Sequence, residues 1–209
     1  MNGADVPTRS RPADRRRQLL EAAYRTLVAS GPRAVRLKDI ASEAEVTPAA
    51  ILYHYPHIDD LIRDIYEESC ERWYEHRRRR LDDVPGPLSG LRLLIETGMP
   101  SSPDDASVRL LCELEGLSVR DDDYARLMQD LFDKQATLYQ EVIAAGAAAS
   151  VFRPAMEPLA IGQSLVAIED SLSYYILNGH PSLGYEECVH RLRATAAALC
   201  GVEAGALTD

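Results

Sequence analysis

Hydrophobic residues recur every three to four positions along almost the whole chain, which is the spacing of one face of an α-helix. Residues 15–30 place Leu19, Ala23 and Leu27 on one face before Gly31 ends the run. Further helices are expected at residues 37–44, 48–55, 57–80, 88–98, 104–118, 122–147, 155–178 and 184–200. No segment alternates in the manner of a strand, so the sequence predicts an all-α protein of about nine helices.

Residues 36–55 have the internal spacing of a helix-turn-helix. Ile40 and Ala41 lie on one face of a short helix, and Val46 fills the turn that follows. Thr47 is a suitable N-cap for the next helix, and Pro48 suits its first position, where a missing N–H costs nothing. The pattern predicts a three-helix DNA-binding domain at residues 1–56 and a larger helical domain at 57–209.

The outward face of the second short helix is small and nearly uncharged, so its backbone can approach base edges closely. Arg36 and Lys38 are expected to hold the DNA backbone. The residues predicted to read or contact DNA are Arg36, Lys38, Thr47, Pro48, Ala49, Ala50, Tyr53, His54, Arg15 and Arg16. Any small three-helix bundle with a Thr-Pro connector remains an alternative explanation of this pattern.

A net charge of −10 is unsuited to DNA binding, but the charge is unevenly distributed along the chain. Residues 1–56 contain nine basic against six acidic residues, whereas 57–209 contain fourteen against twenty-seven. Arg9 and Arg11 precede the first helix, where they form either a phosphate-binding arm or a solvated tail. The run Arg77–Arg80 suits either nucleic acid or the dipole at the end of its helix.

The first 65 residues resemble the TetR family of bacterial regulators. The resemblance is carried by Leu19–Ala23, Gly31, Lys38–Ala41 with Ala44, Val46-Thr47, Tyr53-His54-Tyr55 and Leu61. Phe152-Arg153-Pro154 and Glu169–Leu172 resemble the C-terminal half of the family's betaine-regulator-like type. The resemblance implies a homodimeric repressor that binds a palindromic operator and is released by a small molecule, with residues 57–209 as its helical ligand-binding and dimerisation domain.

Four positions depart from the family pattern. Glu45 stands where the family usually has glycine, so a left-handed turn there would cost about 1 kcal/mol. Arg36 replaces the usual cap of the second helix, and Leu52 replaces a frequent tyrosine. Ile58 replaces a common lysine and removes one expected phosphate contact.

Polar and aromatic residues within the apolar helices are candidates for a ligand pocket. Glu113 and Asp170 lie in apolar stretches, and buried carboxylates need partners, which suits a cationic ligand beside aromatic rings. The predicted ligand-binding residues are Tyr66, Cys70, Trp73, Glu113, Tyr139, Asp170 and Tyr174, with Glu169 as a further candidate. Core packing is the alternative for each of them.

The last two helices are the expected dimer interface, as the resemblance suggests. The helix at 157–177 is apolar nearly all round, so it must be covered on both sides. The final helix carries a mostly apolar stripe, which we expect to pack against its two-fold mate: Cys188, Val189, Leu192, Thr195, Ala196 and Leu199.

Other classes of function find less support in the sequence. No phosphate loop, nucleophile elbow or zinc-ligand spacing is present, so neither an enzyme, a cofactor nor a metal is expected. Cys70, Cys112, Cys188 and Cys200 stand far apart and suit a reducing compartment, with a redox-sensing thiol as the alternative. No membrane span or secretory signal is found, which predicts a cytoplasmic protein. A helical adaptor and a DNA-binding activator stay open.

Overall fold

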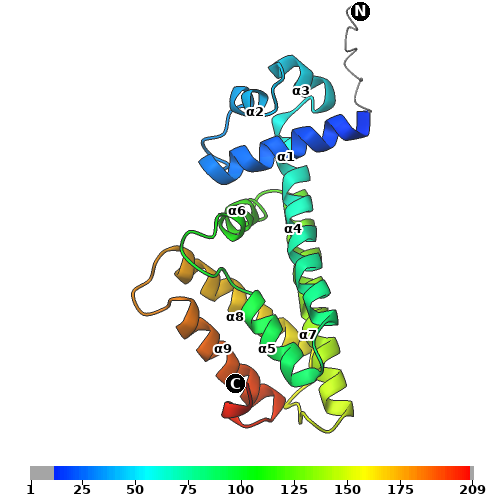
Figure 1. Cartoon of the computed structure of the whole chain (residues 1–209), viewed down its shortest axis with the longest axis vertical. Coiled ribbons are helices and arrows are strands. Elements are labelled where there is room, and N and C mark those ends of the chain that lie inside the picture. The colour runs from blue at the N-terminus through cyan, green and yellow to red at the C-terminus, as the bar shows by residue number, and fades with distance from the viewer. Residues whose placement is uncertain (1–11, 208–209) are drawn as a thin grey trace, which may run out of the picture. The chain divides into compact units, whose positions relative to one another are not determined.

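The computed structural model describes residues 12–207, which form helices joined by turns, with no strand among them (Figure 1). The α-helices of this part of the chain are α1 (Pro12–Ser30), α2 (Leu37–Glu43), α3 (Pro48–His54), α4 (Ile58–Asp82), α5 (Pro87–Thr97), α6 (Ala106–Glu115), α7 (Asp122–Ala148), α8 (Pro158–Leu177) and α9 (Tyr185–Cys200). A short 3-10 helix, η1 (Ala204–Leu207), follows them. The predicted all-α architecture is confirmed. Arg9 and Arg11 lie outside the described residues.

The chain divides into two compact units, residues 1–65 and 66–209, and the division falls inside α4. The boundary expected from the sequence lies after residue 56, at the end of the third short helix. The first unit extends further because Leu61 and Ile65, in the first turns of α4, are almost fully buried within it.

The first unit is a small bundle built on buried aliphatic side chains. Leu19 and Leu27 of α1, Ile40 of α2 and Ile51 of α3 are almost completely buried. An ion pair of 2.7 Å between Arg25 and Glu43 joins the surfaces of α1 and α2. The expected helix-turn-helix elements are therefore present.

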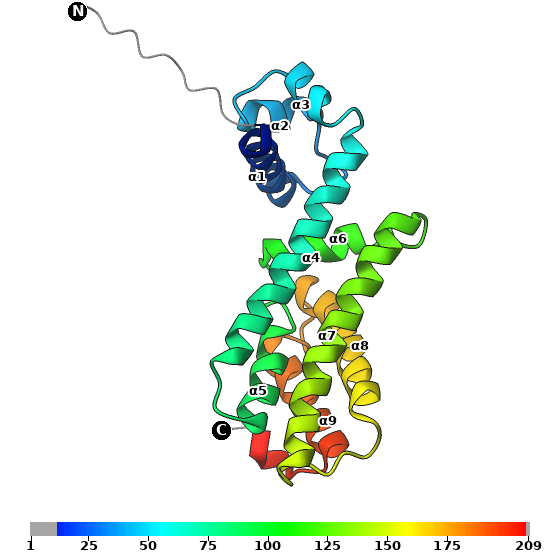
Figure 2. The same ribbon diagram turned by 90° about the vertical axis from the view of Figure 1, so that its right-hand side faces the viewer.

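In the second unit, α7 and α8 lie side by side in both views (Figures 1 and 2). Gly162 of α8 permits this contact, because a Cβ atom there would lie 2.5 Å from the carbonyl oxygen of Ala136 in α7. α5 packs against α7 and α9. The resulting core includes Leu91, Leu94, Ile95, Ala136, Ile143, Phe152, Ile161, Leu165, Val166 and Leu192.

The apolar stripe of α9 has a different role from the one expected. Cys188, Val189, Leu192 and Ala196 are at most 4% exposed and belong to the core of their own chain. These four residues cannot contact a second copy, because helices of the same chain, α5 and α8 among them, already cover them, whereas Thr195 and Leu199 are half-buried. The expected dimer contact was wrong for these four residues, since an apolar stripe does not indicate whether the covering helix belongs to the same chain. For Thr195 and Leu199 it stays a prediction.

Within residues 12–207, no helix combines the length and the apolar character that a bilayer crossing requires.

Candidate functional site

The first unit presents a small polar surface around α3. Thr47, Pro48 and Ala49 are exposed at the start of this helix, and Tyr53 is 85% exposed near its end. The rings of Tyr53 and His54 meet edge to face, with centroids 5.2 Å apart. Arg36 and Lys38 are exposed around the start of α2, whereas Ala50 and His54 are half-buried. This surface combines hydrogen-bonding side chains with the small residues that allow a close approach to base edges.

Local hydrogen bonds hold α3 in this position. The Thr47 hydroxyl accepts a hydrogen bond from the Ala50 N–H at 3.3 Å, and Pro48 follows at the first helical position, as predicted. The turn before it requires a left-handed residue, and Glu45 has φ of 53°. The departure from glycine noted in the sequence therefore falls on a strained backbone position.

The two arginines predicted to bind DNA from α1 are engaged within the first unit. Arg16 forms an ion pair with Asp64 of α4, and its guanidinium lies 5.6 Å from the centroid of the Tyr55 ring. Arg15 donates a hydrogen bond of 3.1 Å to the side chain of Gln18. In this arrangement Arg16 joins α1 to α4 within the unit.

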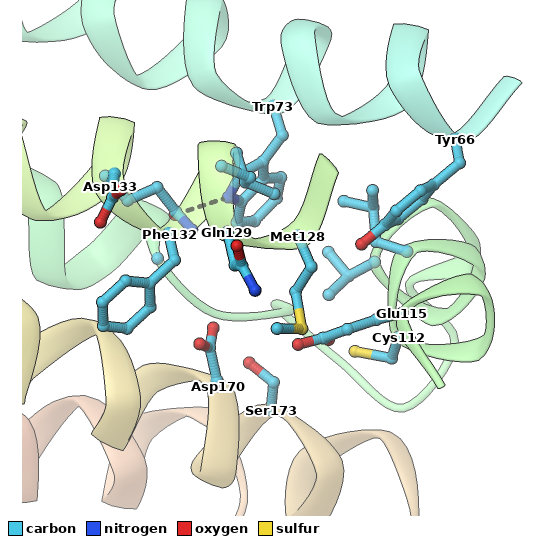
Figure 3. Close-up of a pocket in the computed structure, with 15 residues that line it drawn as sticks. Tyr66, Trp73, Cys112, Glu115, Met128, Gln129, Phe132, Asp133, Asp170 and Ser173 are labelled. Carbon is cyan, nitrogen blue, oxygen red and sulfur yellow. Dashed lines mark hydrogen bonds between the residues drawn. The ribbon is translucent and has the colours of Figure 1, made fainter. Parts of the chain in front are cut away.

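The second unit contains a cavity of about 420 Å³ between α4, α6, α7 and α8 (Figure 3). Three predicted ligand-binding residues line it: Tyr66, Trp73 and Asp170. The remaining lining residues are Gly98, Val108, Leu111, Cys112, Glu115, Met128, Gln129, Leu131, Phe132, Asp133, Gln135 and Ser173. Its size falls within the range of about 300–1,000 Å³ that is typical of small-molecule sites.

Three carboxylates line this cavity: Asp133 is exposed to solvent, whereas Glu115 and Asp170, on different helices, are half-buried. Burial raises the pKa of Asp170 in α8 to about 7, and the negative charges of Glu115 and Glu169 add to the effect. Burial also raises the pKa of Glu115 in α6, although a hydrogen bond from Tyr174 works in the opposite direction. No lysine, arginine or histidine lies among the described residues that line the cavity. A cation there would therefore compensate charges that the lining leaves unpaired.

A buried polar network lies directly beside the cavity. Arg77 and Glu169 are both essentially inaccessible to solvent and form an ion pair at 3.2 Å. The Tyr139 hydroxyl donates a hydrogen bond to Glu169. Arg77 also donates to the side-chain oxygen of Gln135, which accepts a further hydrogen bond of 2.9 Å from the Trp73 indole. The orientation of the Trp73 ring in the cavity is thus fixed by a chain of contacts that ends at Glu169.

The other predicted ligand-binding residues lie outside the cavity wall. Cys70 and Tyr139 are buried, and Tyr139 contacts the cavity only through the Glu169 network. Tyr174 is 43% exposed and reaches the cavity indirectly, through its hydrogen bond to Glu115. Glu113 is exposed to solvent, contrary to the expectation that it is a buried carboxylate.

Sequence reasoning missed Glu115, which takes the place expected for Glu113. The periodicity of α6 contains the signal, because Val108, Leu111 and Glu115 recur at intervals of three and four residues and all line the cavity. Glu113 lies off this face. The face of α6 on which a carboxylate lies therefore indicates whether it reaches the cavity, whereas the apolar character of the surrounding segment does not.

The cysteines show no sign of an activated thiol. Burial raises the pKa of Cys70 and that of Cys112 to about 12, which disfavours the nucleophilic thiolate. Cys188 and Cys200 are buried as well. Within the described residues no group of three or more His, Cys, Asp or Glu side chains is arranged to hold a metal ion.

Comparison with known proteins places these features in a family. Residues 19–65 match the model of the bacterial regulatory proteins of the tetR family. The chain is 20% identical over 150 residues to the HTH-type transcriptional repressor KstR2 of Mycolicibacterium smegmatis, which covers 72% of this chain and 73% of the relative.

Solved structures share the fold. One is a transcriptional regulator from Saccharomonospora viridis in complex with choline, with a TM-score of 0.76 and 24% identity over 86% of this chain and 94% of that chain. Another is a TetR transcription regulator from Haloarcula marismortui, with a TM-score of 0.75 and 20% identity over 90% of this chain and 97% of that chain. At these identities the likeness establishes the fold and leaves the ligand to be argued from the site.

Proposed function

We propose that this chain, which belongs to the TetR family of transcriptional regulators, is a repressor that binds operator DNA as a homodimer and is released by a small cationic molecule. The single observation that carries the proposal is the pairing, in one chain, of an exposed helix-turn-helix surface with a separate acidic, aromatic cavity. DNA binding and ligand binding would then be negatively coupled, each lowering the affinity for the other by the same factor.

The exposed surface around α3 supports the part of the proposal that concerns DNA. Tyr53 of α3 is 85% exposed, so its ring contributes little to the packing of the first unit and is available to a partner. Thr47 to Ala49 present only small groups to an approaching base edge. Arg36 and Lys38 supply the positive charge that phosphates need.

The cavity supports a cation as the released ligand. Trp73, Tyr66 and Phe132 offer aromatic faces, and Glu115 and Asp170 offer negative charge. Aromatic rings combined with carboxylates recognise ammonium groups, and quaternary ones in particular. The similar regulator from Saccharomonospora viridis holds choline, a quaternary ammonium compound, which makes choline a suitable first probe.

The exposed face of α8 supports dimerisation. It carries no charge and consists of small, amide and aromatic side chains: Gln163, Ala167, Ser171, Tyr174 and Tyr175. Depletion of charged residues is typical of the core of a protein interface. We therefore place the dimer contact on this face and not on the stripe of α9. Ala167→Arg should give a monomer in light scattering, whereas Ala144→Arg on the exposed side of α7 should leave the dimer intact.

A gel-shift assay with the DNA that flanks the chain's own gene tests the function. We expect a specific shift that Tyr53→Ala abolishes and that choline weakens. Val119, in the second unit, is as exposed as Tyr53, so Val119→Ala is the matched control and should bind like the unchanged protein.

A helical adaptor that binds only proteins or ligands is the alternative class. Such a protein would give no specific shift, and Tyr53→Ala would not alter its interactions. An activator would give the same shift, but deletion of its gene would lower transcription of the target gene. A reporter fused to the flanking promoter separates these two outcomes.

A further inference from the structure

We infer that the cavity is built for a molecule with two positive charges, such as a diamine or a bis-quaternary ammonium compound, with one charge beside Glu115 and the other beside Asp170. The inference rests on the proposed cationic ligand and specifies how many charges that ligand carries. It follows from the charge balance of the cavity, from the placement of its two half-buried carboxylates and from its size.

Asp133 lines the cavity but is exposed to solvent and screened by it, so the charge balance leaves two half-buried carboxylates, Glu115 and Asp170, without a cationic protein partner. Glu169 is adjacent to the cavity but is already neutralised by Arg77. Lys134, on the neighbouring surface of α7, is paired with Glu71 at 2.5 Å. Glu115 is approached by the uncharged hydroxyl of Tyr174. Arg77 attracts Asp170 through its charge, but its ion pair is with Glu169, and no described cation forms an ion pair with Asp170. A ligand with one charge would neutralise only one of these two carboxylates.

The two carboxylates occupy different parts of the cavity. Figure 3 shows Glu115 on the side where Tyr66 and Cys112 lie, and the charge of Glu115 raises the pKa of both these residues after the effect of burial. The Tyr66 ring thus lies on the same side of the cavity as this carboxylate.

Asp170 projects from α8 toward the space below Trp73, on the side of Phe132 (Figure 3). Ser173, one turn further along α8, also lines the cavity, and it lies between the two carboxylates in this view. Each carboxylate is therefore accompanied by an aromatic side chain, which makes two separate places for an ammonium group.

The cavity also has the volume for two groups. At about 420 Å³ it lies within the range of sites that enclose whole drug-sized molecules, so a single small ammonium group would leave much of it empty. Met128 and Leu131 supply apolar contacts along the wall, as a hydrocarbon spacer between two charges would need.

Isothermal titration with matched pairs of ligands tests the inference. The probes are 1,4-diaminobutane against butylamine, 1,6-diaminohexane against hexylamine, and 1-butanol and 1-hexanol as neutral controls. We expect at least one diamine to bind tenfold or more tightly than the monoamine of equal chain length. Glu115→Gln and Asp170→Asn should each reduce that preference to less than threefold, since each removes one of the two charges.

Asp130→Asn is the control variant, because Asp130 is a carboxylate of α7 that is exposed to solvent and lies outside the cavity lining. It should change the preference less than twofold. Thermal melting establishes that the two isosteric variants are folded, and we expect both to melt at or above the temperature of the unchanged protein, because each loses a buried charge.

The outcomes separate the inference from the proposal on which it rests. Equal affinity for diamine and monoamine, with both tighter than the alcohol, overturns the two-charge inference and leaves the single-cation proposal standing. Affinities for amines no better than for alcohols overturn both. A diamine preference that survives Glu115→Gln or Asp170→Asn also overturns the inference, because the second charge is then recognised elsewhere.

Discussion

The guanidinium of Arg77 in α4 lies 3.2 Å from the carboxylate of Glu169 in α8, and both side chains are buried almost completely. Backbone and side-chain groups of the core lie directly against this ion pair. Leu94 accepts a hydrogen bond of 2.8 Å from Arg77 through its carbonyl oxygen, and the Tyr139 ring centroid lies 5.6 Å from the guanidinium. Gly98 has no side chain, and a Cβ atom there would lie 1.9 Å from the Glu169 carboxylate. The core of the second unit is therefore shaped around this pair.

Removing one partner of the pair should be costly, because the other charge would remain buried without compensation. We expect Arg77→Met to lower the free energy of unfolding by about 3–5 kcal/mol. Urea denaturation of the whole chain, followed by the fluorescence of Trp73, measures this change. Trp73 is the single tryptophan and is linked to Arg77 through Gln135, so its emission should also change in the folded state.

Arg79 provides the matched control for this experiment. It belongs to the same run of four arginines but is exposed to solvent. Arg79→Met should change the free energy of unfolding by less than about 0.5 kcal/mol. Equal effects of the two substitutions would show that the run acts as a whole at the end of α4 and that the buried pair contributes little.

The run Arg77–Arg80 also shows where sequence reasoning reached its limit. Two explanations were open, nucleic acid binding and the helix dipole, and Arg77 follows neither of them. Its partner Glu169 lies 92 residues away, and helical periodicity places residues on a face without saying which faces meet. The partner of a buried charge is set by tertiary packing, so it was not accessible from the local pattern.

Elements determined by local chemistry were predictable. The positions of the helices followed from the spacing of apolar residues, and the Thr47 cap and the Pro48 start are in place. The left-handed conformation of Glu45 agrees with the glycine that the family resemblance implies at this position. Tyr66, Trp73 and Asp170 were found because aromatic and acidic residues stand out in apolar helices. Glu115 was missed although the periodicity of α6 contained the signal, whereas the intrachain role of α9 was missed because it depends on which helix covers which.

The affinity for a quaternary cation should depend on pH through Asp170. Burial, with the charges of Glu115 and Glu169, raises the pKa of Asp170 in the empty cavity to about 7. A bound cation favours the ionised carboxylate. Choline has no titrating group of its own, so its affinity should increase as the pH rises from 5.5 to about 7 and then level off. If binding releases one proton, the affinity for choline can increase by at most about tenfold for each pH unit.

The raised pKa of Asp170 has the opposite effect on the stability of the unliganded protein, because its contribution to stability falls as the pH rises. Asp170 is protonated more readily when folded than when unfolded, so its contribution to stability is greatest at low pH and is lost as the pH rises through about 7. Asp170→Asn should therefore melt close to the unchanged protein at pH 4 and clearly above it at pH 8. It should also flatten the pH dependence of choline binding. A choline affinity that stays constant from pH 5.5 to 8 in the unchanged protein would contradict this account.

The left-handed turn before α3 offers a direct test of backbone strain. Glu45 has φ of 53°, which a glycine adopts without penalty. We expect Glu45→Gly to raise the free energy of unfolding of the first unit by about 1 kcal/mol. Ala49→Gly is the control, because Ala49 is helical, and glycine there should instead destabilise by about 0.5–1 kcal/mol. If both variants are destabilised, the Glu45 side chain stabilises the first unit by more than its left-handed backbone conformation costs.

Salt dependence should distinguish the basic residues that touch DNA from those that hold the first unit together. Lys38 is exposed near the start of α2, and we expect Lys38→Ala to reduce the slope of log affinity against log salt by about one unit, the effect of one lost phosphate contact. Arg16 is paired with Asp64 and lies against the Tyr55 ring. Arg16→Ala should therefore leave the slope unchanged and lower the free energy of unfolding by less than about 1 kcal/mol.

Gel shifts at several salt concentrations, together with urea denaturation, measure both quantities. If Arg16→Ala reduces the slope as much as Lys38→Ala does, then Arg16 leaves Asp64 to contact a phosphate, and the ion pair belongs only to the DNA-free protein.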